Sequence, residues 1–358
     1  MTIALTSELL DPSEIRHAVD IVLEDFLAAK SQSAPSPELA GIIDTLREFL
    51  FAGGKRIRPV MCLCGWHAAR GRGDPRPVLQ AAASLELFHA FALIQDDVMD
   101  DSAIRRGRPS VHRELAGRRP DGVRTAAGRF GANAAILLSD LALTWSDEML
   151  HTAELTPDQL DSALPVLDTM RTELMFGQYL DLLAAGRPTG DVGQALAISR
   201  YKTAKYTIER PLHFGAALAG SGLAVAEACT AYGIPTGEAF QLRDDLLGVF
   251  GDPQRTGKPV IDDLREGKCT ALMALAVLRA TPAQLRLLRF MVGHPGIDEA
   301  RADAVRAVLD ATGARQETER MITVRHREAL DALDSAPFPA PVTAVLRQLA
   351  HAVSARAV

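Results

Sequence analysis

The chain has 358 residues, of which 47% are hydrophobic and 23% charged, and its formal net charge is -6. This composition supports a substantial buried core and excludes a disordered chain. The negative charge, with lysines and arginines dispersed along the chain, argues against nucleic acid as a partner.

The N-terminal segment lacks a basic region followed by a long apolar core, so we expect no signal peptide. No apolar run reaches the roughly 18 residues that a membrane span needs. The four cysteines have the spacing neither of a zinc site nor of a disulfide framework. We therefore expect a cytoplasmic protein that is not an integral membrane protein.

The first candidate for function in chain order is Gly53-Gly54-Lys55-Arg56-Ile57-Arg58-Pro59. Glycines ahead of a helix let backbone N–H groups approach an anion, and the basic side chains supply positive charge. A solvated basic turn is the alternative interpretation.

A helix with a broad apolar face is predicted over residues 78–98, and it leads into Asp96-Asp97-Val98-Met99-Asp100. Asp96 and Asp100 share one helix face, whereas Asp97 lies about 100° away and suits a second layer or a basic partner. His89 lies two turns before Asp96 on the same helix face. It is either a packing residue or a ligand. A solvated helix end is the alternative, but it leaves the apolar residues before the acids unexplained.

Arg105-Arg106-Gly107-Arg108-Pro109 follows the acids. Adjacent carboxylates resist burial unless a cation neutralises them, and Mg²⁺ binds through carboxylates together with substrate phosphates. Arginines would repel a bare cation but fit when a diphosphate lies between metal and protein. The pattern therefore indicates a Mg²⁺–diphosphate enzyme. We expect the long basic segment 107–131 to be a mobile lid.

Helical patterns continue over residues 133–150, 159–183, 192–219 and 224–249, and strand signals are scarce. Lys202-Thr203 lies in the third pattern, where Lys202 and Lys205 are alternatively solvated. Asp244-Asp245 lies in the fourth and is followed by Lys258 and Lys268. Two such acidic helices would offer their aspartates to a central cavity. We predict one all-α domain over residues 36–358, after a partly flexible segment 1–35.

In combination, these motifs make the chain resemble the trans-isoprenyl diphosphate synthases over about residues 40 to 275. The matching segments are 53–59, 96–100, 105–112, 202–203, 240–245, 257–259 and 267–270. The resemblance implies a helical bundle of the isoprenoid-synthase type and a homodimer. It also implies a prenyltransferase that joins isopentenyl diphosphate to an allylic diphosphate, with about three Mg²⁺ ions per site.

The resemblance also implies residue roles. Magnesium is expected on Asp96 and Asp100 on one side, and on Asp244 and Asp245 on the other, with Asp97 among the catalytic acids. The diphosphate of isopentenyl diphosphate is expected on Lys55, Arg58, His89 and Arg106. The allylic diphosphate is expected on Arg105, Lys202, Lys258 and Lys268. Thr203 and Gln241 would present oxygen dipoles to the carbocation.

Product length is expected to depend on the bulk below the first acidic motif. Phe91 lies about 7.5 Å down the helix from Asp96. Ala92 beside it is small, and Phe88 lies a further turn down. This arrangement resembles the geranylgeranyl-forming pattern and predicts a twenty-carbon product. A farnesyl product is the alternative, as is a pair of phenylalanines that only pack.

Two positions depart from the family pattern. Gln95 replaces a histidine, with little expected effect, and Gly248 replaces the last aspartate of the second motif. On a continuing helix, Asp244, Gly248 and Asp252 would share a face, which is the spacing of a class I terpene cyclase motif. Such a cyclase has no use for the basic residues that bind isopentenyl diphosphate. A third hypothesis is a regulatory subunit of a heteromeric synthase. Such subunits usually lack one acidic motif, whereas this chain has both, apart from Gly248.

Overall fold

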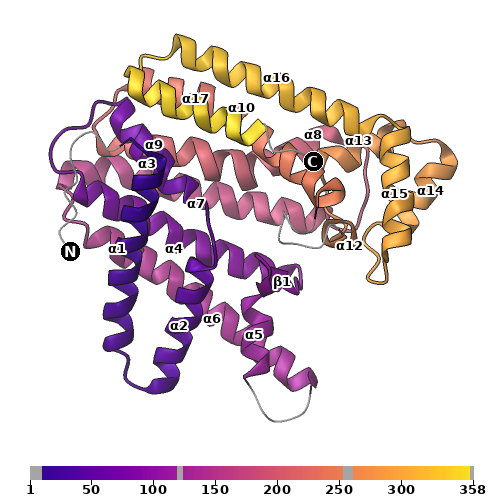
Figure 1. Cartoon of the computed structure of the whole chain (residues 1–358), viewed down its shortest axis with the longest axis horizontal. Coiled ribbons are helices and arrows are strands. Elements are labelled where there is room, and N and C mark those ends of the chain that lie inside the picture. The colour runs from indigo at the N-terminus through magenta and orange to yellow at the C-terminus, as the bar shows by residue number, and fades with distance from the viewer. Residues whose placement is uncertain (1–9, 119–123, 253–260, 355–358) are drawn as a thin grey trace. The chain divides into compact units, whose positions relative to one another are not determined.

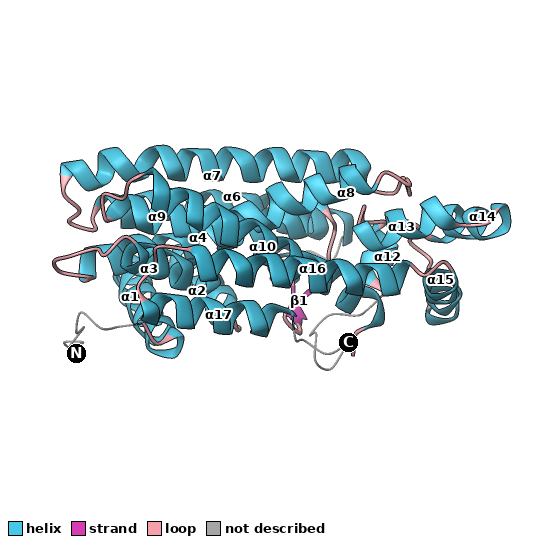
Figure 2. Cartoon of the chain, turned by 90° about the horizontal axis from the view of Figure 1, so that it is seen from above, coloured by secondary structure: helices cyan, strands magenta, loops and turns pink. Residues whose placement is uncertain are grey.

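The structure is a computed structural model, and it describes residues 10–118, 124–252 and 261–354. Helices form nearly all of the described chain, and its two strands have two residues each (Figure 2). The predicted all-α class is therefore confirmed. The chain divides into two compact units, Met1–Leu63 with Arg72–Leu160 and Cys64–Gly71 with Asp161–Val358.

Among its described residues, the first unit contains seven helices wholly or in part and one hairpin. They are α1 (Pro12–Gln32), α2 (Pro37–Phe51), the start of α3 (Ile57–Ala68), α4 (Arg76–Met99), β1 (Ile104–Arg105), β2 (Arg108–Pro109), α5 (Val111–Gly117), α6 (Arg124–His151) and the first residues of α7 (Pro157–Ala184). Helix α4 lies at its centre, against α1, α2, α5 and α6 (Figure 1). Helix α4 is long and apolar enough to cross a membrane, but 72% of its most apolar 18-residue stretch is buried inside the structure. It is the core helix of this unit.

The second unit is also helical among its described residues. Its elements are the end of α3, most of α7 (Pro157–Ala184), α8 (Val192–Ser199), the π-helix η1 (Arg200–Glu209), α9 (Arg210–Leu218), α10 (Leu223–Phe250), α12 (Asp262–Glu266), α13 (Ala271–Arg279), α14 (Pro282–Met291), α15 (Glu299–Ala311), α16 (Ala314–Ser335) and α17 (Ala340–Ser354). Helix α10 is central, and α16, α17 and η1 pack along it. The buried Tyr232 hydroxyl donates to the Leu346 carbonyl at 2.8 Å and ties α10 to α17.

The predicted helix over 192–219 is interrupted by the wider turns of η1. Two glycines of neighbouring helices let their backbones approach η1 closely. A Cβ on Gly237 of α10 would lie 2.4 Å from Ala204 Cα, and one on Gly177 of α7 would lie 2.6 Å from Lys202 N. Such π-turns are frequent at functional sites. Here α7 and α10 hold the segment that contains Lys202 and Thr203.

The expectation that residues 107–131 form a connection between helices is wrong for their described part, which contains α5 and the start of α6, whereas their role as a mobile lid stays a prediction. A hairpin turns at Arg106 and Gly107, whose φ angles are 54° and 75°, as a tight two-residue hairpin requires. Helix α5 follows and packs against α6. A long connection in a helical protein therefore need not be a loop, because a short helix such as α5 can bury its few apolar residues, here Val111 and Leu115.

The buried ion pair between Arg56 and Glu86 gives a test of the first unit. Both side chains are under 5% exposed and their charged atoms lie 3.0 Å apart. Because Glu86→Ala leaves a buried charge with less compensation, we expect it to lower the free energy of unfolding by about 3 kcal/mol. Glu48→Ala breaks the exposed pair with Arg108 and should cost less than about 1 kcal/mol. Chemical denaturation measures both, and equal effects would contradict the assignment.

Candidate active site

The first acidic group comprises Asp96, Asp97 and Asp100 at the C-terminal end of α4. The Asp100 N–H donates to the Asp96 carbonyl at 2.9 Å, so these two residues lie one turn apart on one face, as predicted. Asp101 has a φ of 53°, and the Ser102 N–H donates back to the Asp97 carbonyl at 3.0 Å, which ends the helix. Carboxylates are unfavourable at the negative end of a helix dipole. This end of α4 therefore requires cations.

Arg105 of the hairpin supplies one of these cations. Its Nε lies 2.9 Å from Asp97 Oδ1, and its NH2 group lies 3.3 Å from Asp96 Oδ2. Asp97 is fully buried, and the prediction that it holds a basic residue is confirmed. The hairpin thus places a guanidinium beside the carboxylate that we expect to bind metal.

The basic group comprises Lys55, Arg58, His89 and Arg106, from the loop before α3, from α3, α4 and the hairpin. Arg106 donates to the Gly53 carbonyl and so lies against the Gly53-Gly54 loop. Burial, then the charges of Arg58, Arg106, Arg105 and Arg56, hold the pKa of His89 well below its usual value. His89 is therefore neutral at ordinary pH, where it offers a hydrogen bond amid positive charge. This environment favours an anion.

Arg56, within the same motif, has a structural role. It is buried, pairs with Glu86 and Asp20, and donates to the Leu50 carbonyl at 2.8 Å. The sequence motif therefore divides its basic residues between the core and the anion site.

Phe88 and Phe91 lie below the first acidic group on α4. Their ring centroids are 5.5 Å apart, and both side chains are buried. Ala92 between Phe91 and the acids is only partly buried. Gln95 donates to the Ser139 hydroxyl at 2.6 Å, so the residue that replaces the family's histidine joins α4 to α6.

In the second unit, a hydrogen-bond relay connects η1 to the second acidic motif. The Thr203 hydroxyl donates to Gln241 Oε1 at 2.6 Å, and Gln241 Nε2 donates to Asp245 Oδ1 at 2.7 Å. The two dipolar residues predicted beside the carbocation are therefore neighbours, and each fixes the orientation of the next.

Lys202 pairs with Asp181 of α7 at 2.6 Å, and Lys205 pairs with Glu173 at 2.9 Å. The alternative that these lysines are merely solvated is therefore wrong. Asp181 was missed by sequence reasoning, because an isolated acid in a helical pattern resembles a surface residue. Gly177, one turn before it, was the available signal, since it allows η1 to approach α7.

Asp245 is buried, and its pKa is raised to about 7, with burial as the largest cause. The negative charges of Asp263 and Asp244 contribute to this rise in pKa, whereas the Gln241 hydrogen bond and the charge of Lys268 oppose it. Lys268 lies 3.3 Å from Asp263 and 2.8 Å from Glu266. Asp245 is therefore a buried acid among other carboxylates, with one amide and one lysine that favour its charged form.

Arg243, missed by sequence reasoning, anchors this motif from behind. Its two terminal nitrogens lie 2.6 and 2.7 Å from the Glu319 carboxylate, and one also donates to the Ser354 carbonyl at 3.1 Å. The residue before Asp244 is thus fixed to α16 and to the end of α17.

The expectation that Asp252 continues the Asp244 face is wrong. Helix α10 ends at Phe250, and Gly251 is extended with a ψ of 167°. Asp252 is therefore outside the helix and does not continue the helix face of Asp244. The arrangement of a class I terpene cyclase motif is thus not formed. Lys258, with the rest of the 257–259 motif, lies outside the described residues. In the following motif, 267–270, the Thr270 hydroxyl caps α13 by accepting a hydrogen bond from the Met273 N–H at 3.2 Å.

The donor sets fit magnesium bound together with a diphosphate. All of the predicted ligands are carboxylates, the oxygen donors that Mg²⁺ prefers. Among residues 10–118, 124–252 and 261–354, no three His, Cys, Asp or Glu side chains form a metal cluster by themselves. Substrate oxygens would complete such a coordination shell. That the two acidic groups face each other stays a prediction, since each belongs to its own unit.

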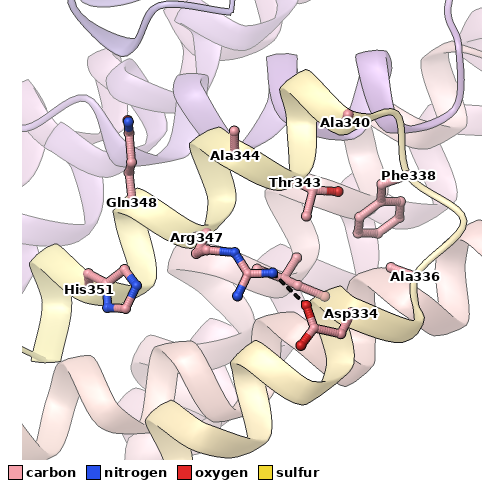
Figure 3. A pocket seen from close by; sticks show the side chains of 10 residues that line it. Asp334, Ala336, Phe338, Ala340, Thr343, Ala344, Arg347, Gln348 and His351 are labelled. Carbon is pink, nitrogen blue, oxygen red and sulfur yellow. Dashed lines mark hydrogen bonds and ion pairs between the residues drawn. The ribbon is translucent and has the colours of Figure 1, made fainter.

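A surface hollow of about 670 Å³ lies between the end of α16 and α17 (Figure 3). It is lined by residues such as Phe338, Thr343, Arg347 and His351, with Arg347 paired to Asp334. None of the predicted site residues lines it. The candidate active site is defined by the acidic and basic groups rather than by this hollow.

Comparison with known proteins agrees with this chemistry. The polyprenyl synthetase family model matches residues 41–310. A geranylfarnesyl diphosphate synthase of Aeropyrum pernix is 35% identical over 64% of this chain and 68% of its own. A (2E,6E)-farnesyl diphosphate synthase of Mycobacterium bovis is 32% identical over 83% of this chain and 78% of its own.

A solved structure is also similar. The geranylgeranyl pyrophosphate synthase from Corynebacterium glutamicum, complexed with isoprenyl diphosphate and magnesium, superposes with a TM-score of 0.93 at 39% identity. The match covers 97% of this chain and 100% of that one. The chain belongs to the polyprenyl synthetase family and is a prenyltransferase, as the motifs predicted.

The raised pKa of Asp245 gives a test of this geometry. Native Asp245 keeps its proton up to about pH 7, whereas the unfolded chain releases it near pH 4. The free energy of unfolding of the metal-free protein should therefore fall as pH rises through this window. We expect Asp245→Asn to reduce that slope, measured by denaturation in chelator from pH 5 to 8. Magnesium should restore stability at pH 8 in the unaltered chain. An unchanged slope in the variant would contradict the assignment.

Proposed function

We propose that this chain is a magnesium-dependent synthase that condenses isopentenyl diphosphate with an allylic diphosphate to give geranylgeranyl diphosphate. The observation that carries the proposal is the end of α4. There, carboxylates on one helix face lie next to Arg105, which pairs with Asp96 and Asp97. The same unit contains the basic group around a neutral His89. An acidic face with adjoining cations suits a metal-bound diphosphate.

The reaction requires an allylic C–O bond to ionise. Bound magnesium would neutralise the charge that develops on the leaving diphosphate. Lys202, fixed by Asp181, and Arg105, fixed by Asp97, would hold this diphosphate with little reorganisation. The Thr203 and Gln241 oxygens would face the cation while the double bond of isopentenyl diphosphate attacks it. The departing diphosphate can accept the final proton, so no protein base is required.

The test of this function is incubation of the purified protein with Mg²⁺, labelled isopentenyl diphosphate and each allylic starter. Chelation should abolish condensation. Asp96→Asn and Asp244→Asn should each lower kcat/KM by about 100-fold or more, since each removes charge stabilisation of the transition state. Asp44→Asn, an exposed acid of α2, is the matched control. Undiminished condensation by either site variant would overturn the proposal.

Product length is proposed from the two phenylalanines of α4. Phe91 is buried and packs on Phe88, so two rings together close the space below Asp96. Phe91→Ala should lengthen the product beyond twenty carbons, because it removes the upper ring of this floor. Chromatographic sizing of the products decides the matter. An unchanged distribution in Phe91→Ala would remove Phe91 from this role.

We also propose a homodimer located in the cytoplasm. Exposed apolar side chains gather on two helices, and such patches mark association surfaces. They are Phe130, Ile136 and Leu137 of α6, and Met175, Phe176, Tyr179, Leu182 and Leu183 of α7. The four cysteines are free, as a reducing compartment favours.

The dimer proposal predicts the effect of a charge on these helices. Leu137 is 67% exposed and Phe176 is 60% exposed. Leu137→Glu and Phe176→Glu should give a monomer in sedimentation or size-exclusion experiments, because each places a charge in an apolar interface. Leu223→Glu is the control, since Leu223 is 73% exposed at the start of α10. A monomeric unaltered protein would contradict the proposal.

A further inference from the structure

Position 248 is where this chain departs most clearly from the acidic pattern of its family. Gly248 lies four residues after Asp244 within α10, so both positions share one face of the helix. A side chain at 248 would therefore point to the same side as the Asp244 carboxylate. The sequence leaves this place without an oxygen ligand.

The structure fills this place from another helix. A Cβ on Gly248 would lie 1.9 Å from Oδ2 and 2.9 Å from Cγ of Asp263. Real atoms do not approach so closely, so any side chain at 248 would collide with the Asp263 carboxylate. Asp263 therefore occupies the space that a 248 side chain would need.

Asp263 is well placed to act from this position. It belongs to α12, whose Leu264 is 1% exposed. The Gly293 N–H donates to the Leu264 carbonyl at 2.8 Å, and the Gly186 N–H donates to the Gly267 carbonyl at 3.0 Å. These contacts hold the middle and the C-terminal end of a short helix. The carboxylate is thus held by the surrounding fold.

The two oxygens of Asp263 have different surroundings. Oδ1 lies 3.3 Å from Lys268 Nζ, whereas Oδ2 is the atom directed at Gly248 on α10. The carboxylate also acts electrostatically on the buried Asp245. Asp263 therefore belongs to the negative charge of the second acidic motif and not only to a pair with Lys268.

We propose that Asp263 supplies the carboxylate that position 248 lacks, and that Gly248 is the residue that admits it to the Asp244 face. The second acidic group then comprises Asp244, Asp245 and Asp263, drawn from α10 and α12. This inference rests on the proposed magnesium dependence. Asp263 would bind or orient the cation together with Asp244, and the diphosphate oxygens would complete the shell.

The first experiment measures magnesium binding without turnover. Mg²⁺ is titrated calorimetrically into the full chain saturated with inorganic pyrophosphate. Asp263→Asn keeps the shape of the side chain and removes its charge, so we expect Mg²⁺ affinity to fall about 10-fold or more. Asp262→Asn is the matched control, because Asp262 is adjacent and pairs with the exposed Arg265. It should bind Mg²⁺ as the unaltered chain does.

The second experiment tests the role of the glycine. Gly248→Ala adds only a methyl group, but that group must displace the end of the Asp263 side chain. Mg²⁺ affinity should therefore fall although no carboxylate is lost, and thermal melting should change little because the colliding group is a side-chain end. Gly41→Ala is the control, since a Cβ there meets no atom within 4 Å.

The third experiment exchanges the two positions. Gly248→Asp alone should weaken Mg²⁺ binding through the collision, and Asp263→Gly alone through the lost charge. The double variant returns a carboxylate to the same space from α10, and we expect it to bind Mg²⁺ better than either single variant. A double variant no better than Asp263→Gly, or an Asp263→Asn variant with unchanged affinity, would overturn the inference.

The outcomes separate this inference from the proposed function. If the unaltered chain with pyrophosphate binds no Mg²⁺, the proposed function fails and the inference fails with it. If the unaltered chain binds Mg²⁺ and Asp263→Asn binds it equally well, only the inference fails. A change confined to the KM of the allylic substrate would mean that Asp263 only positions Lys268, and this too would overturn it.

Discussion

Carboxylates placed at the ends of apolar helices have to be neutralised, and this requirement explains much of the two units. A buried charge costs several kcal/mol unless a partner of opposite sign is near. In the first unit, Arg105 meets this need directly by pairing with Asp97. The hairpin that follows α4 turns the chain back, so that Arg105 lies beside Asp96 and Asp97. Local backbone geometry and active-site charge are thus coupled.

The second unit meets the same requirement differently. Asp245 receives a hydrogen bond from Gln241 rather than a guanidinium, and its pKa is raised to about 7. The adjacent Arg243 is directed away, to Glu319 and the end of α17. The described contacts of the two acidic groups therefore differ, because a guanidinium pairs with Asp97 whereas a neutral amide donates to Asp245.

Basic residues that lie close together in the sequence also have different partners. Arg56 is buried and pairs with the buried Glu86 and with the partly exposed Asp20. The surrounding arginines keep His89 neutral. Position therefore decides function among residues of identical type. Arg56 of the motif stabilises the fold, whereas Arg58, two residues later, is expected to bind an anion.

The sequence by itself determined the all-α class, the two acidic motifs, the basic residues around them and the family. These follow from periodicity and from residue types that repeat at fixed spacing. Only the tertiary structure decided which partner each charge has. The pairing of Lys202 with Asp181, the end of α10 before Asp252 and the approach of Asp263 to Gly248 join residues far apart in sequence or depend on where a helix stops. No local pattern encodes such contacts, because they arise only when helices pack.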